Sequence, residues 1–88
     1  MVEVYHPSVT LTFETVEHEH RLFLQWLRED MLQVVVDLSA VAHCDSTGLA
    51  LLLEMKRLCK QKGIQFLLIN MSEKVSGLVE FCGVETVL

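Results

Sequence analysis

The fold is decided by residues 34–69, which read VVVDLSAVAHCDSTGLALLLEMKRLCKQKGIQFLLI. Two apolar, β-favouring runs, 33–38 and 64–69, bracket a segment whose apolar residues recur at helical spacing. Near-continuous runs of this kind are typical of strands that are covered on both faces of a sheet. We therefore predict a strand, a helix over residues 46–62 that ends at Gly63, and a second strand parallel to the first.

The N-terminal third predicts two short strands and a helix. Val9, Leu11 and Phe13 alternate with hydroxyl residues, which is the period-2 pattern of a strand with one buried face, and a weaker strand precedes it. Thr15 then stands where its side chain can cap a helix that ends near residues 28–30.

The C-terminal segment predicts one more helix and one more strand. Ser72 can cap a helix that ends at Gly83, and a short strand follows over residues 84–88. The predicted order is β-β-α-β-α-β-α-β. This is a single α/β domain over residues 1–88, with a mixed sheet covered by about three helices.

Composition argues against several classes of protein. The chain is 51% hydrophobic and carries a formal net charge of −5, which suits a globular protein and disfavours nucleic acid as a partner. Three cysteines without CxxC spacing indicate free thiols in a reducing compartment rather than a disulfide framework. We find no signal-peptide pattern and no long apolar run, so we expect a cytoplasmic protein without direct membrane insertion.

The junction Asp45-Ser46-Thr47-Gly48 is the predicted functional site. It places two hydroxyls at the positive end of a helix dipole, where backbone N–H groups lack internal partners and favour anions. We predict that Ser46 caps the helix and that a phosphate on its hydroxyl would be stabilised there.

The helix over 46–62 has two predicted faces. At about 100° per residue, one set of side chains gathers on the side that must face the sheet. This set is Gly48, Leu51, Leu52, Met55, Leu58 and Cys59. The residues predicted to project outward are Ser46, Leu49, Ala50, Leu53 and Arg57. An exposed leucine pair beside a modifiable hydroxyl favours a partner-binding face, whereas the alternative is that both leucines lie under a neighbouring loop or helix.

These segments resemble the STAS domain, which anti-sigma factor antagonists share with the cytoplasmic tails of sulfate transporters. The run Asp45-Ser46-Thr47-Gly48-Leu49 is similar to the family signature Asp-Ser-[Ser/Thr]-Gly-Leu, whose first hydroxyl is phosphorylated in the antagonists. The resemblance therefore implies a phosphorylation-type site at Ser46. Within the family, residues 48–53 and 60–63 look most similar to the small STAS subunit of Mla phospholipid ABC transporters, which docks on the ATPase subunit through this helix.

The resemblance implies a binding module without enzymatic activity, metal or cofactor. The expected partner is the ATPase of an Mla-type transporter that maintains outer-membrane lipid asymmetry, and the partner would hold the chain at the inner membrane. The alternative is an anti-sigma factor antagonist, whose partners are a serine kinase and an anti-sigma factor. The expected partner-binding residues are Asp45, Ser46, Thr47, Gly48, Leu49, Ala50, Leu53 and Arg57. Because the sequence ends at the last predicted strand, we expect the C-terminal helix common in the family to be missing or reduced.

The sequence gives weaker support to an enzyme or to a ligand-binding site than to a protein-binding module. An aspartic-protease turn would need one residue fewer between Asp45 and Gly48 and a second catalytic carboxylate. His43 and Cys44 are adjacent on an extended segment, so their side chains point apart and cannot form a thiol–imidazole pair. His18 and His20 are poorly spaced for a metal on a helix. A phosphate or nucleotide held by the amides of residues 46–49 would lack a glycine-rich cradle.

Overall fold

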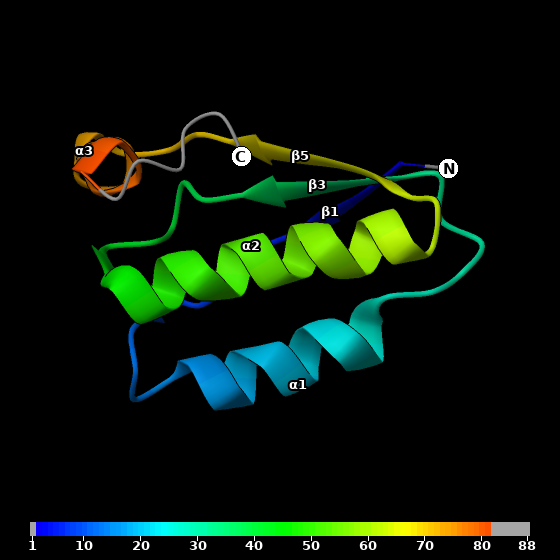
Figure 1. Ribbon diagram of the computed structural model, residues 1–88, viewed down its shortest axis with the longest axis horizontal. Helices are drawn as coiled ribbons and strands as arrows, with labels where there is room; N and C mark the ends of the chain where they lie inside the picture. Colours follow the sequence, from blue (N-terminus) through cyan, green and yellow to red (C-terminus); the bar gives the residue numbers. More distant parts are fainter. Residues whose placement is uncertain (1, 82–88) are drawn as a thin grey trace.

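The computed structural model describes residues 2–81 and contains three helices and five short strands in that range. The elements are β1 (Val2–Tyr5), β2 (Thr10–Leu11), α1 (Val16–Trp26), β3 (Gln33–Asp37), β4 (His43–Cys44), α2 (Ser46–Gln61), β5 (Gln65–Ile69) and α3 (Glu73–Phe81). The α/β class and the three helices are confirmed (Figure 1). The predicted helix end at Gly83 and the predicted strand over 84–88 lie outside the described residues.

The strands form two small sheets. The larger has the order β1-β3-β5, and the smaller pairs β2 with β4. Every pairing within residues 2–81 is parallel, whereas a mixed sheet was predicted. The parallel connection from β3 through α2 to β5 is confirmed, with Val35 paired to Leu67. The two-residue strand β4 was not predicted, because so short a strand has no readable period.

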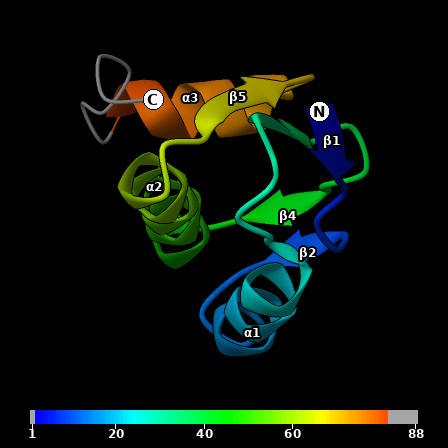
Figure 2. The same cartoon turned by 90° about the vertical axis from the view of Figure 1, so that its right-hand side faces the viewer.

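Helices α1 and α2 lie on one side of the larger sheet (Figure 2). Val34 and Val36 of β3 face them and are fully buried. On the opposite face Val2, Val4 and Leu67 are 57%, 45% and 48% exposed, so the prediction of strands covered on both faces is wrong. Apolar and β-branched residues favour a strand on either face, and their presence does not show that both faces are covered.

The core lies between this sheet and the helices. Leu52 and Met55 of α2 are fully buried, as predicted, and Phe23 of α1 belongs to the same core. Tyr5 stacks edge-on against Phe23 with ring centroids 5.2 Å apart. None of the helices in residues 2–81 is both long and apolar enough to cross a membrane.

A buried carboxylate, which the sequence analysis did not anticipate, joins α1 to β1. Glu19 is 2% exposed, and its Oε2 accepts a hydrogen bond from the Tyr5 hydroxyl at 2.6 Å. Its Oε1 accepts one from the Ser8 N–H, also at 2.6 Å. Burial and the hydrogen bond to Glu19 raise the pKa of Tyr5. A carboxyl group inside the fold is tolerated because both of its oxygens are hydrogen-bonded.

The rotation of α2 can be tested with two leucines. Leu49 is 3% exposed, and Leu53 is half-buried. Leu49→Ala should therefore lower the free energy of unfolding by about 2–5 kcal/mol, through lost transfer energy and a cavity. Leu53→Ala should lower it less. Urea unfolding followed by circular dichroism measures both, and equal losses would show that α2 is rotated from the orientation described.

The bond between Tyr5 and Glu19 predicts a loss of stability at high pH. Because the pKa of Tyr5 is raised in the fold, its contribution is complete below the ordinary tyrosine pKa of about 10 and is lost as the pH rises above it. Tyr5 is the only tyrosine of the sequence, so the ultraviolet absorbance of tyrosinate measures the ionisation of Tyr5. Tyrosinate absorbance should appear together with unfolding. Ionisation near pH 10 with the fold intact would contradict the buried bond.

The matched variant is Tyr5→Phe, which keeps the ring and removes the hydroxyl. It should cost about 1–3 kcal/mol at neutral pH, because the Glu19 carboxylate loses a buried donor. It should also remove part of the stability loss seen above pH 10 in the wild type.

Candidate functional site at the start of helix α2

The carboxylate of Asp45 builds the first turn of α2. Asp45 has an extended backbone, and its Oδ1 accepts hydrogen bonds from the Gly48 N–H at 3.0 Å and the Thr47 hydroxyl at 2.5 Å. Its Oδ2 accepts a third from the Phe13 N–H at 3.1 Å. Asp45 is therefore the N-cap, and the prediction that Ser46 caps this helix is wrong. Ser46 is already the first residue of the helix, one position past the cap.

The same contacts stabilise the ionised form of Asp45. Hydrogen bonds from the Thr47 hydroxyl and the Gly48 N–H, with a smaller contribution from the Phe13 N–H, lower the pKa of Asp45. The group is thus ionised at neutral pH. A fixed negative charge at the start of α2 also suits the positive end of the helix dipole.

Ser46 occupies the first helical position, and its side chain is exposed. Its hydroxyl has no hydrogen-bond partner among residues 2–81, whereas the Thr47 hydroxyl donates to Asp45. Ala50, one turn further along, is exposed on the same side of the helix. The structure therefore offers one unengaged hydroxyl at the positive end of α2, beside a small apolar side chain.

The remaining predicted site residues do not all join this surface. Leu49 was expected to project outward, but it is 3% exposed and belongs to the core. Gly48 is buried against β2, where an added Cβ would overlap the Leu11 carbonyl. Its role is to let α2 approach β2 closely, and it offers no side chain to a partner.

Leu53 and Arg57 lie further along α2. Leu53 is half-buried, and Arg57 is exposed. The Arg57 guanidinium donates two hydrogen bonds to Glu54, each of 2.6 Å, in a bidentate pair. At 1.5 Å per residue, Arg57 lies about 16 Å from Ser46 along the helix axis. The eight predicted residues therefore do not form one continuous patch.

Phe13 is an exposed residue that the sequence analysis misplaced. It was predicted on the buried face of a strand, but its side chain is 70% exposed, and β2 ends at Leu11. Residues 12–15 form a turn, in which Thr15 donates its N–H to the Thr12 carbonyl at 2.9 Å. The Thr15 hydroxyl donates to the Thr10 and Thr12 carbonyls, so it does not cap α1 as predicted. The two hydroxyl residues that flank Phe13 and Glu14 were the available signal for a turn.

The other chemical readings gain no geometric support. Burial, with a smaller contribution from the Asp45 charge, raises the pKa of Cys44, which keeps its thiol protonated. His43 is exposed. Among residues 2–81 there is no group of three or more His, Cys, Asp or Glu side chains that could hold a metal ion. His20 instead lies between the helices, with its Nε2 4.0 Å from Glu54 Oε2.

The role of Asp45 predicts a change in stability at low pH. Because its pKa is lowered in the fold, its contribution is complete above the ordinary value of about 3.9 and is lost as the pH falls below it. Asp45→Ala should lower the urea midpoint at neutral pH and flatten the loss of stability below about pH 4. Asp45→Asn, which keeps one acceptor oxygen, should fall between Asp45→Ala and the wild type. If Asp45→Ala matched the wild type at neutral pH, the cap would have no energetic role.

Comparisons with known proteins agree with this arrangement. The profile of the STAS domain matches residues 2–88. A crystal structure of a sulfate transporter family protein from Wolinella succinogenes superposes with a TM-score of 0.74. That likeness covers 99% of this chain and 71% of the other, at 22% sequence identity. No curated protein matches the chain. The family profile extends over nearly every residue, and the chain therefore belongs to the STAS domain family.

Proposed function

We propose that residues 1–88 form one STAS domain that acts as a protein-interaction module and presents the start of α2 to its partner. STAS domains generally act as interaction modules rather than as enzymes. The observation that carries this proposal is the exposed Ser46 hydroxyl on the first turn of α2, next to a capped and rigid helix end. A surface held this firmly loses little conformational entropy on binding.

The contact surface that we assign consists of Phe13, Ser46, Thr47 and Ala50, all exposed. Phe13 supplies an aromatic side chain of the kind enriched in binding hot spots. The hydrogen bond from its N–H to Asp45 holds the loop of Phe13 against the start of α2. Leu49 is left out of this surface, because its burial makes it unavailable to a partner.

The partner that we propose is the ATPase subunit of an Mla-type phospholipid ABC transporter. Support comes from the similarity of residues 48–53 and 60–63 to the small STAS subunit of those transporters. In this role the chain is cytoplasmic, stays at the inner membrane through the ATPase, and serves the maintenance of outer-membrane lipid asymmetry. It inserts no segment of its own into the bilayer.

A second candidate, an anti-sigma factor antagonist, is favoured by the exposure of Ser46. A serine kinase can reach this hydroxyl, because Ser46 is exposed on the first turn of α2. The added charge would then act mainly on the complex, where the phosphate must lose its water. Phosphorylation would release the anti-sigma factor without unfolding the antagonist.

Ser46→Asp separates stability from binding. Ser46 is not the cap, so both Ser46→Asp and Ser46→Ala should keep the free energy of unfolding within about 1 kcal/mol of the wild type. At a packed interface the new carboxylate must be desolvated, so Ser46→Asp should weaken binding to the ATPase subunit by about 1–3 kcal/mol. Ser46→Ala should retain more of the affinity. Calorimetric titration of the purified ATPase subunit measures the difference.

The matched control is Ser76→Asp, which adds the same charge at an exposed position of α3. It should leave the affinity unchanged. Equal affinities for Ser46→Asp and the wild type would rule out the start of α2 as the contact surface. Titration of an anti-sigma factor in parallel distinguishes the two candidate partners. Mass spectrometry of the chain after incubation with the serine kinase shows whether Ser46 accepts phosphate.

A further inference from the structure

Strand β1 forms one edge of the larger sheet. In the order β1-β3-β5 it pairs with β3 on one side, and among residues 2–81 no other backbone group bonds to the backbone of residues 2–5. The N–H and C=O groups along its other side therefore lack partners within this part of the chain. Figure 2 shows β1 on the side of the sheet away from α2. A row of unpaired groups of this kind is a template for one more strand.

Strand β1 also lacks the residues that usually protect an edge. Its sequence is Val2-Glu3-Val4-Tyr5, without proline or lysine. Glu3, its single charged residue, is paired with Arg28, whose Nη2 lies 3.3 Å from Glu3 Oε1. Each copy of the chain has a formal net charge of −5, and charge repulsion between two copies is smallest where local charges are already neutralised. Two copies can therefore approach each other at β1.

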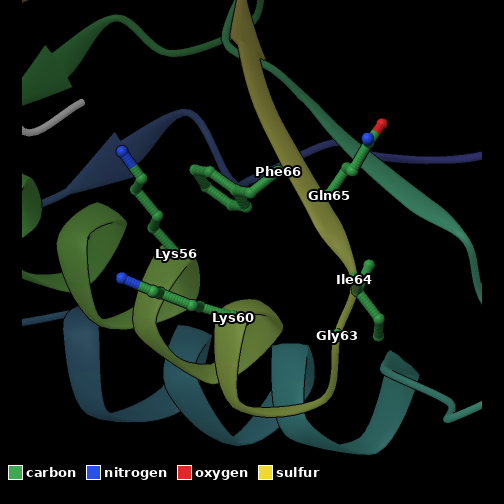
Figure 3. Close-up of a pocket in the computed structure, with 6 residues that line it drawn as sticks. All are labelled: Lys56, Lys60, Gly63, Ile64, Gln65 and Phe66. Atoms are coloured by element: carbon green, nitrogen blue, oxygen red, sulfur yellow. The ribbon is translucent and has the colours of Figure 1, made fainter.

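The opposite edge of the sheet, β5, is less suited to a further strand. A hollow of about 320 Å³ beside its first residues is lined by Gln65 and Phe66, together with Lys56 and Lys60 of α2. Figure 3 shows Lys56 next to the ring of Phe66. Lysines beside an edge strand discourage the addition of another strand. This favours β1 over β5 as the edge that accepts one.

The exposed side of the sheet carries an apolar row that ends at β1. Val4 is paired with Val35, and Val35 with Leu67, so the three side chains cross the sheet in register. Val4 and Leu67 are exposed, and Val35 is half-buried. A strand that places an apolar residue opposite Val4 would continue this row, and side chains directly opposite each other on neighbouring strands stabilise their pairing.

We propose that two copies of the chain associate through antiparallel pairing of their β1 strands, which joins the sheets of both copies into one continuous sheet. The unpaired edge selects an extended segment, and β1 itself supplies one with the matching alternation of side chains. A two-fold axis makes this contact self-complementary, as is usual in homodimers. The pairing uses no residue of the surface around Ser46, so its test is independent of the proposed function.

The charge of Glu3 decides the register of this pairing. Opposite residues of an antiparallel pair lie on the same face of the sheet, so either central residue, Glu3 or Val4, can lie on the two-fold axis. With Glu3 on the axis, two Glu3 carboxylates would lie opposite each other, and like charges in this position destabilise a strand pair. With Val4 on the axis, Val4 meets Val4 of the second copy, and Glu3 lies opposite Tyr5. This second register is the one that we assign.

Substitution of Val4 tests the dimer. Sedimentation velocity of the wild type should show a reversible monomer–dimer equilibrium that shifts toward the dimer in high salt, because salt screens the repulsion between two acidic copies. Val4→Lys places two ammonium groups opposite each other and should weaken the dimer about tenfold. Val4→Thr, which stays β-branched, should weaken it less. Circular dichroism should show both variants folded, because Val4 is 45% exposed in the monomer.

The matched control is Leu67→Lys, which adds the same charge to the same face at the other edge of the sheet. It should leave the dimer intact. Equal weakening by both lysine variants would indicate that the copies pack face to face, and weakening by Leu67→Lys alone would indicate pairing through β5. Either result would overturn the proposal, as would a wild type that stays monomeric at every concentration.

A cysteine at position 4 tests the register. Directly opposite residues of an antiparallel pair have Cα atoms about 4.5–5.5 Å apart, within the range of about 4.4–6.8 Å that a disulfide spans. Val4→Cys should therefore form a disulfide-linked dimer when it is treated with oxidised glutathione. The tryptic peptide of residues 1–21 has no native cysteine, so mass spectrometry of linked peptides assigns the bond to position 4.

The control for this cross-link is Val2→Cys, in the same peptide and on the same face. Its side chain is more exposed in the monomer, so random collisions would link it at least as fast as Val4→Cys. In the assigned register the two copies of residue 2 lie about 14 Å apart, which is four residues of extended chain and too far for a disulfide. Val2→Cys should therefore stay unlinked. Equally fast linking of both variants would overturn the proposed pairing.

Discussion

The hydrogen bonds to the Asp45 carboxylate are the interactions on which the rest of the structure depends. One ion accepts hydrogen bonds from the Gly48 N–H, the Thr47 hydroxyl and the Phe13 N–H, which belong to segments more than thirty residues apart. It thereby starts α2, holds the turn that follows β2 and leaves the Ser46 hydroxyl unengaged. Without this ion the first amides of α2 would lack partners, and the loop of Phe13 would lose its attachment to the helix.

The close approach at Gly48 completes this arrangement. Because Gly48 has no side chain, α2 can lie directly against the Leu11 carbonyl of β2. This contact sets the rotation of the helix, so Leu49 enters the core while Ser46 and Ala50 face outward. A larger residue at position 48 would push α2 away from β2 and disturb both the core and the surface. The STAS signature residues therefore differ in what they do. Asp45 caps α2, Gly48 lets α2 contact β2, and Ser46 is exposed to solvent.

Helix α2 joins two surfaces of different chemistry. Its start presents the Ser46 hydroxyl and is bonded to the loop of Phe13 through Asp45, and its end carries Lys56, Arg57, Lys60 and Lys62. The helix dipole matches this division, since an acidic cap suits the positive end and Lys60 suits the negative end.

The sequence by itself determined the elements whose signals are local. Helical spacing and β-favouring runs located β3, α2 and β5, and the parallel connection between them followed from their order. Gly63, with φ of 70°, ends α2 where a left-handed residue was expected. The tertiary structure decided what depends on distant neighbours. Leu49 is buried because α2 lies against β2, and Glu19 is buried because Tyr5 and Ser8 supply its donors. Such contacts join residues far apart in the chain, so no local period could have shown them.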